Sequence, residues 1–235
     1  MRRSRLVGAL AAVLVAVGLL VAPVVAQEGD TVATALRIQQ VDSTNPAATE
    51  MVVAWAGSAA ALESADITVN GESAEPSSVA PLAGADTGLV LVIDNSAAME
   101  EGGALQRARE SLAELVQNRP EGQLVSVISV GGSRARNVQS WTTDTAKVLD
   151  VIAALGPDGD SALWRGDNSA AGLLDVRPDL IGQVVVFAGG EDQSATRVSL
   201  ARGAIAATGA SVHAIVVEDR GLDAGSVRSL VDTAG

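Results

Sequence analysis

Residues 89–99, "LVLVIDNSAAM", are the stretch on which the fold prediction depends. The uninterrupted apolar run 89–93 is typical of a strand that is buried on both faces of a sheet. Asp94 and Ser96 follow it directly, and apolar residues at helical spacing begin a few residues later. The stretch therefore predicts a buried strand, a polar loop and the start of a helix.

The same alternation of strand and helix patterns continues along the rest of the chain. Buried strands are expected at 123–130, 183–190 and 211–218, a short edge strand at 136–140, and helices at 105–118, 144–155, 166–176, 195–209 and 223–235. This order predicts an α/β fold, with a doubly wound, mostly parallel sheet and helices on both of its faces. Ligands bind such sheets at the carboxyl ends of the strands, where the polar loops lie.

The preceding part of the chain has a different pattern. Short alternating stretches, separated by Ser, Pro and Ala, fill residues 27–85, and Asn70-Gly71 is a strong hairpin turn signal after a β-branched run. We therefore expect a small all-β domain at 27–85, followed by the α/β domain at 86–235.

The first 26 residues have the features of a targeting segment. Arg2, Arg3 and Arg5 precede the apolar run 6–22, and small residues occupy 24–26. This order predicts a cleaved signal peptide. An uncleaved N-terminal anchor is the alternative, because residues 6–26 carry no charge and are long enough to span a bilayer. Either reading predicts an exported protein, extracellular or associated with the cell envelope or membrane.

Charge and cysteine content exclude several kinds of function. The formal net charge is −12, and removing the three arginines of residues 1–26 makes it −12 − 3 = −15. Such an acidic chain argues against nucleic-acid binding. The chain has no Cys, which excludes disulfides, thiolate metal sites and cysteine nucleophiles.

Four segments, taken in order, resemble the von Willebrand factor A (VWA) family. They are "LVLVIDNSAAM" at 89–99, "GDSAL" at 159–163, "QVVVFAGGED" at 183–192 and "GASVHAIVVE" at 209–218. The resemblance implies a VWA fold and a role in binding another protein. A small β domain before it is similar to bacterial exported VWA proteins. Because the family usually continues into a final edge strand and helix, we expect this domain to lack its C-terminal end.

The resemblance also implies a metal-ion-dependent adhesion site, in which Asp94, Ser96 and Ser161 would be metal ligands. Ala98 and Gly189 stand where the family has a second Ser and a second Asp, and neither supplies a side-chain oxygen. With one matched carboxylate left, affinity for a hard cation should fall. The expected site is therefore degenerate, with no cofactor or only weakly bound Mg²⁺ or Mn²⁺.

The sequence leaves the roles of these and the neighbouring polar side chains open. Four other acids are expected in loops at the same edge of the sheet, where they either substitute as ligands or are solvated; these are Asp160, Asp167, Glu191 and Asp192. Asp94 and Ser96 can also serve a structural purpose, because side chains before a helix satisfy its free N–H groups.

No catalytic residues are expected. His213 is the single His and lies in a predicted buried strand, and the chain has neither a G-x-S-x-G elbow nor a phosphate-binding P-loop. The sequence therefore predicts a non-enzymatic, adhesion-type module that binds a protein partner, with membrane association through the N-terminal segment or a missing C-terminal region. The alternative is a metal-free structural or assembly module of a longer cell-envelope protein, in a context like that of a secretion system.

Overall fold

The computed structural model describes most of the chain after residue 75 and shorter pieces before it. The described residues are 11–17, 36–42, 48–55, 67–69, 71–74, 76–217 and 224–233. The chain divides into two compact units, residues 1–82 and 83–235.

Among its described residues, the first unit contains strands and no helix. They are β1 (Ala11–Val17), β2 (Leu36–Asp42), β3 (Ala48–Trp55), β4 (Ile67–Val69), β5 (Glu72–Ala74) and β6 (Pro76–Pro81). Four of them form a sheet in the order β2-β3-β1-β6, and β4 pairs with β5 as an antiparallel hairpin. Gly71, in the turn of that hairpin, has a φ of +82°, which glycine adopts without steric cost.

Strand β1 lies inside the segment that the sequence predicts to be a signal peptide or anchor. It pairs in parallel with β3 and with β6, and the rest of residues 1–26 lies outside the described residues. The pairing does not bear on cleavage or anchoring, so the role of residues 1–26 stays a prediction, as does the small β domain at 27–85. Among the described residues, no helix combines the length and apolar character needed to cross a bilayer.

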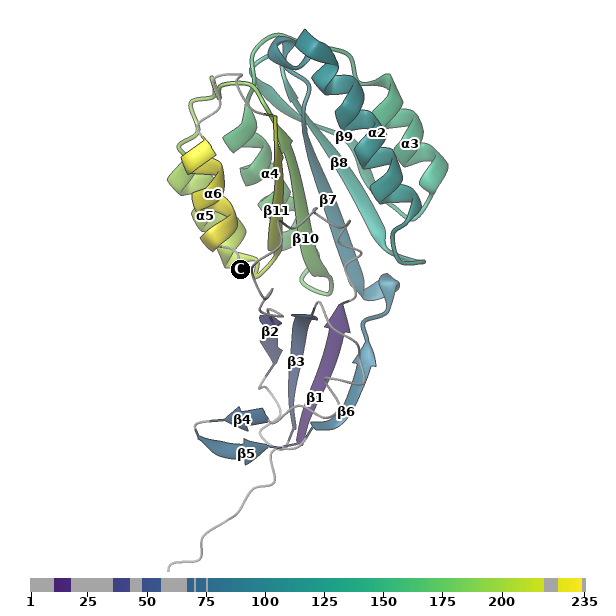
Figure 1. The fold of residues 1–235 in the computed structure, drawn as a ribbon, viewed down its shortest axis with the longest axis vertical. Coiled ribbons are helices and arrows are strands. Elements are labelled where there is room, and N and C mark those ends of the chain that lie inside the picture. The colour runs from purple at the N-terminus through teal and green to yellow at the C-terminus, as the bar shows by residue number, and fades with distance from the viewer. Residues whose placement is uncertain are drawn as a thin grey trace, which may run out of the picture. The chain divides into compact units, whose positions relative to one another are not determined.

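The second unit is built on a five-stranded sheet in the order β11-β10-β7-β8-β9 (Figure 1). Its strands are β7 (Thr87–Asp94), β8 (Leu124–Gly131), β9 (Arg134–Thr142), β10 (Ile181–Ala188) and β11 (Ser211–Val216). All neighbouring pairs are parallel except β8 and β9, which are antiparallel. The predicted α/β fold with a mostly parallel sheet is confirmed.

Helices cover both faces of this sheet (Figure 1). They are α2 (Ala104–Gln117) and α3 (Thr145–Ala154) on one face, and α4 (Leu163–Asp175), α5 (Val198–Ala207) and α6 (Ala224–Thr233) on the other. The central strand β7 is buried along its whole length. Leu91 and Ile93 pack toward α2 and α3, whereas Val90 and Val92 pack toward the opposite helices. This explains the unbroken apolar run, because side chains alternate between two covered faces.

Short 3₁₀ turns complete the second unit, at Gly84–Asp86, Ala97–Met99 and Glu101–Gly103. Most elements differ from their predicted bounds by one to three residues, and two of the differences have a clear cause. Strand β9 extends over nine residues rather than 136–140, because it pairs antiparallel with β8 along most of its length. Helix α4 begins at Leu163 rather than at 166, because a carboxylate from a distant loop accepts a hydrogen bond from its first turn.

Candidate functional site

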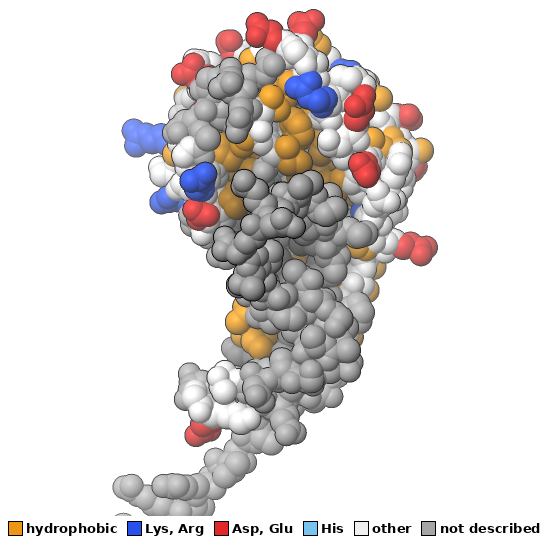
Figure 2. Space-filling model, in the orientation of Figure 1, with side chains coloured by type: hydrophobic (Ala, Val, Ile, Leu, Met, Phe, Trp, Pro, Cys, Tyr) orange, Lys and Arg blue, Asp and Glu red, His pale blue; other side chains and the backbone are white. Residues whose placement is uncertain are grey.

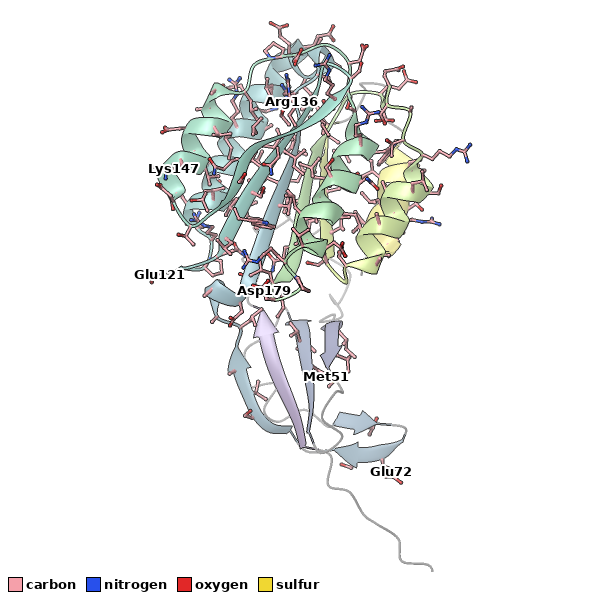
Figure 3. The ribbon with its side chains drawn as sticks, turned by 180° about the vertical axis from the view of Figure 1, so that it is seen from behind. Met51, Glu72, Glu121, Arg136, Lys147 and Asp179 are labelled. Carbon is pink, nitrogen blue, oxygen red and sulfur yellow. The ribbon has the colours of Figure 1, made fainter. Side chains whose placement is uncertain are left out.

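The candidate site lies at the carboxyl ends of the parallel strands, where four loops meet. Backbone hydrogen bonds join these loops: the N–H of Ala97 donates to the carbonyl of Gly159 at 2.7 Å, and the N–H of Ser133 donates to Asp160 at 2.9 Å. Figure 3 labels Arg136 at this end of the unit, and Glu121 and Asp179 at the other. The loops are therefore fixed to one another by main-chain contacts.

Asp94 is the last residue of β7, and it is completely buried. Its Oδ1 accepts a hydrogen bond from the N–H of Ser96 at 2.9 Å. Its Oδ2 accepts two more, from the N–H groups of Gly190 at 2.7 Å and Gly189 at 3.2 Å. Hydrogen bonds to an ionised acceptor are stronger than hydrogen bonds between neutral groups, so a carboxylate that accepts several N–H groups is held firmly in place. Asp94 thus fastens its own loop to the loop after β10.

The other two predicted ligands lie beside Asp94. Ser96 and Ser161 are each 1% exposed, and neither hydroxyl has a hydrogen-bond partner. Gly190 brings them together: a Cβ atom added there would lie 2.6 Å from Ser96 Oγ, 3.2 Å from Asp94 Oδ2 and 3.3 Å from Ser161 Cβ. The three residues singled out by the resemblance are therefore neighbours around Gly190.

The position of the missing acid is occupied by another side chain. A Cβ atom added to Gly189 would collide with the sulfur of Met99, which is fully buried. A metal at this place would need oxygens that neither Gly189 nor Ala98 supplies, and the Asp94 carboxylate already accepts three N–H groups. No cluster of three or more Asp, Glu or His side chains suited to a metal occurs among the described residues. The residues present do not fit the family's metal arrangement.

Asp192 is one of the four acids that the sequence offers as substitutes for the missing ligand. Its Oδ1 accepts a hydrogen bond from the N–H of Trp164 at 3.2 Å, and its Oδ2 accepts one from Ser194 Oγ at 2.9 Å. The Asp192 carboxylate therefore caps the start of α4, where no local side chain does so. Asp160 and Glu191 are exposed, as expected for solvated loop carboxylates.

Asp167 does not lie in a loop, which corrects the sequence prediction. It is in the second turn of α4, completely buried, and neither of its carboxylate oxygens has a partner. Burial, and to a smaller extent the charge of Asp192, raises the pKa of Asp167 well above its usual value. Burial also raises the pKa of Asp192, against several hydrogen bonds that lower it. The signal for burial was present, because Leu163, Ala170 and Leu174 share one helical face with Asp167.

The prediction that His213 lies in a buried strand is wrong for its side chain. His213 lies on β11, but its side chain is exposed, as is that of Ile215, which is 44% exposed. The reason is that β11 forms an edge of the sheet, so its alternate side chains are less covered than those of central strands.

On the face seen in Figure 2, acidic and basic side chains are interspersed over the second unit.

One comparison with known proteins gives a family match. The family model for the von Willebrand factor type A domain matches residues 89–191. A search of curated protein sequences finds no match.

Solved structures share the fold. A von Willebrand factor type A protein from Catenulispora acidiphila is 21% identical, with a TM-score of 0.57, over 63% of this chain and 37% of that one. Proximal thread matrix protein 1 from the mussel byssus, with a zinc-occupied MIDAS motif, is 15% identical, with a TM-score of 0.56, over 62% and 39%. An aerotolerance-related membrane protein from Bacteroides fragilis is 16% identical, with a TM-score of 0.50, over 63% and 88%.

The chain thus spans well under half of the first two structures. The von Willebrand factor type A model matches residues 89–191, and the second unit shares its fold with these solved structures.

Proposed function

We propose that the second unit is a non-enzymatic protein-binding module that acts through the loops at the carboxyl ends of its strands. One observation carries this proposal: the Asp94 carboxylate holds two loops together through three backbone N–H groups. Loops fixed in this way form a preorganised surface, and preorganisation lowers the entropy lost on binding.

We also propose that this surface works without a metal at Asp94, Ser96 and Ser161. The support is chemical, because Met99 fills the place of the missing acid and Ala98 provides no side-chain oxygen. The proposed role is adhesion or docking, with a protein partner whose contacts are made by loop side chains. An exported or membrane-associated location is proposed from the Arg-rich, apolar N-terminal segment.

Site-specific photo-crosslinking tests the proposal. A photoreactive residue is placed at Ala97 or Glu191, both exposed in these loops, and the matched control is placed at exposed Glu121, at the opposite edge. We expect adducts with a protein partner from the two loop positions, unchanged by EDTA, and none from Glu121. Equal labelling from all three positions would contradict a loop surface, and loss of adducts in EDTA would contradict a metal-free one.

A structural or assembly role in a longer cell-envelope protein is the second candidate. The lost oxygens at Ala98 and Gly189 favour it, because a scaffold has no need of an open metal position. The two candidates differ in the lifetime of the complex. A partner that co-purifies in a fixed ratio supports assembly, whereas a partner that exchanges within minutes supports docking.

A further inference from the structure

Strand β11 leaves one side of its backbone open. It is the last strand on its side of the five-stranded sheet, and among the described residues it pairs with β10 alone (Figure 1). Just past its end, the N–H of Val217 donates to the Ala188 carbonyl of β10 at 2.9 Å. Backbone polar groups alternate in direction along a strand, so every second residue before Val217 also faces β10. The N–H and C=O groups that point away from β10 are those of Val212, Ala214 and Val216.

The two edges of the sheet differ in how they are protected from another strand. Strand β9, at the other edge, carries the exposed Arg134 and Arg136, and its register with β8 shifts. Charged side chains and irregular pairing are the usual means of keeping a further strand from an edge. Strand β11 has neither, because it keeps an unbroken register with β10 and contains no Asp, Glu, Lys or Arg. It is therefore the edge at which another strand can pair.

Apolar side chains flank the open backbone on both faces of β11. On one face, Val212 and Val216 belong to the apolar cluster that also contains Val227 and Leu230 of α6. On the opposite face, the Ile215 side chain is 44% exposed. Apolar pairs between neighbouring strands stabilise a sheet. A segment with apolar residues at alternate positions therefore fits this edge.

The charge of the chain distinguishes between the possible occupants of this edge. Its formal net charge is −12, so a second copy would be repelled, whereas a segment with Lys or Arg at its ends would be attracted. A second copy would also bring its own α6, which packs into the same cluster as β11, to this edge.

We propose that β11 accepts an extended segment of another protein as a further strand of the sheet. The segment is apolar at alternate positions and basic at its ends. Main-chain hydrogen bonds to Val212, Ala214 and Val216 supply affinity, and the flanking side chains supply selectivity. This edge is separate from the loops at the carboxyl ends of the strands, so the inference holds whether or not those loops bind a partner.

The test uses the full chain and a short peptide of alternating Val and Thr with Lys at both ends. A control peptide has Pro in place of its central Thr, because Pro lacks the N–H that a paired strand needs. We expect the first peptide to slow amide hydrogen exchange, followed by NMR, at Val212, Ala214 and Val216. Exchange at His213 and Ile215 should change much less, since their N–H groups already face β10. The control peptide should have no effect.

Two edge variants and a matched control locate the binding. Ile215→Lys places a charge beside the edge, and Ala214→Pro removes an outward N–H at a position where an edge strand tolerates Pro. Each should weaken peptide binding about tenfold. Leu200→Lys makes the same change of charge at a residue of α5 that is 61% exposed, and it should leave binding unchanged. If Ala214→Pro does not melt cooperatively, the comparison of Ile215→Lys with Leu200→Lys decides.

Three results would overturn the proposal. The first is that the wild type does not bind the peptide, or that the slowed exchange spares the three outward N–H groups. The second is that binding survives in the edge variants. The third is a dimer in sedimentation that Ile215→Lys dissociates and the peptide does not, which would make a second copy the occupant of the edge.

Discussion

Removing the Asp94 carboxylate is expected to destabilise the second unit even when no metal is present. The substitution Asp94→Ala leaves the N–H groups of Ser96, Gly189 and Gly190 without their acceptor. A buried donor left unsatisfied costs about 1–3 kcal/mol. Water entering at the edge of the sheet would offset part of this cost, so the loss in unfolding free energy should be about 3 kcal/mol in total.

Thermal unfolding in EDTA measures this loss. For a chain of this size, each 1 kcal/mol lowers the melting temperature by about 2–4 °C, so we expect a fall of roughly 6–12 °C. Asp160→Ala is the matched control, because Asp160 is exposed and contributes its backbone carbonyl to the loop contacts. Its effect should stay within about 0.5 kcal/mol. If Asp94→Ala melts like the wild type in EDTA and weakens the protein only when Mg²⁺ is added, the hydrogen-bonding account is wrong.

Three further substitutions test the buried acid of α4 and the two glycines beside Asp94. In EDTA, the free energy of unfolding of Asp167→Asn should rise relative to that of the wild type as the pH rises above 3.8, the pKa of the unfolded-state carboxyl. The reason is that the raised folded-state pKa of Asp167 stabilises the wild type most below that pH. Urea unfolding at two pH values measures the difference. Gly190→Ala should cost about 1–3 kcal/mol in urea unfolding, since its Cβ meets Ser96 Oγ. Gly189→Asp should lower the melting temperature and give no Mg²⁺-dependent gain unless Met99→Ala accompanies it.

The strand, loop and helix order of the second unit could be predicted because each signal is local. The apolar run 89–93 lies on the central strand, and apolar residues at helical spacing mark α2. Alternation of buried strands with helices leaves few ways to arrange the sheet. The resemblance also named Asp94, Ser96 and Ser161, and the structure brings them together around Gly190.

What each side chain does in the site could not be predicted, because it depends on contacts between distant residues. Asp94 accepts hydrogen bonds from Gly189 and Gly190, which follow it in the chain by 95 and 96 positions. Met99 fills the space at Gly189, and no short-range pattern pairs those two residues. A charged residue lowers the expectation of burial, yet the packing of α4 buries Asp167 completely.

The replacement at Gly189 and the bonding of Asp94 explain one another. An Asp at position 189 would set a second carboxylate near the first, and two such charges repel unless a cation or a shared proton lies between them. With Gly at this position the repulsion is absent, and the Met99 sulfur packs where the acid would stand. The N–H groups of Gly189 and Gly190 then donate hydrogen bonds to the Asp94 carboxylate. We expect loops held in this way to keep their arrangement whether or not divalent cations are present, so partner affinity at this surface should depend on the loop side chains and not on an ion bridging from Asp94.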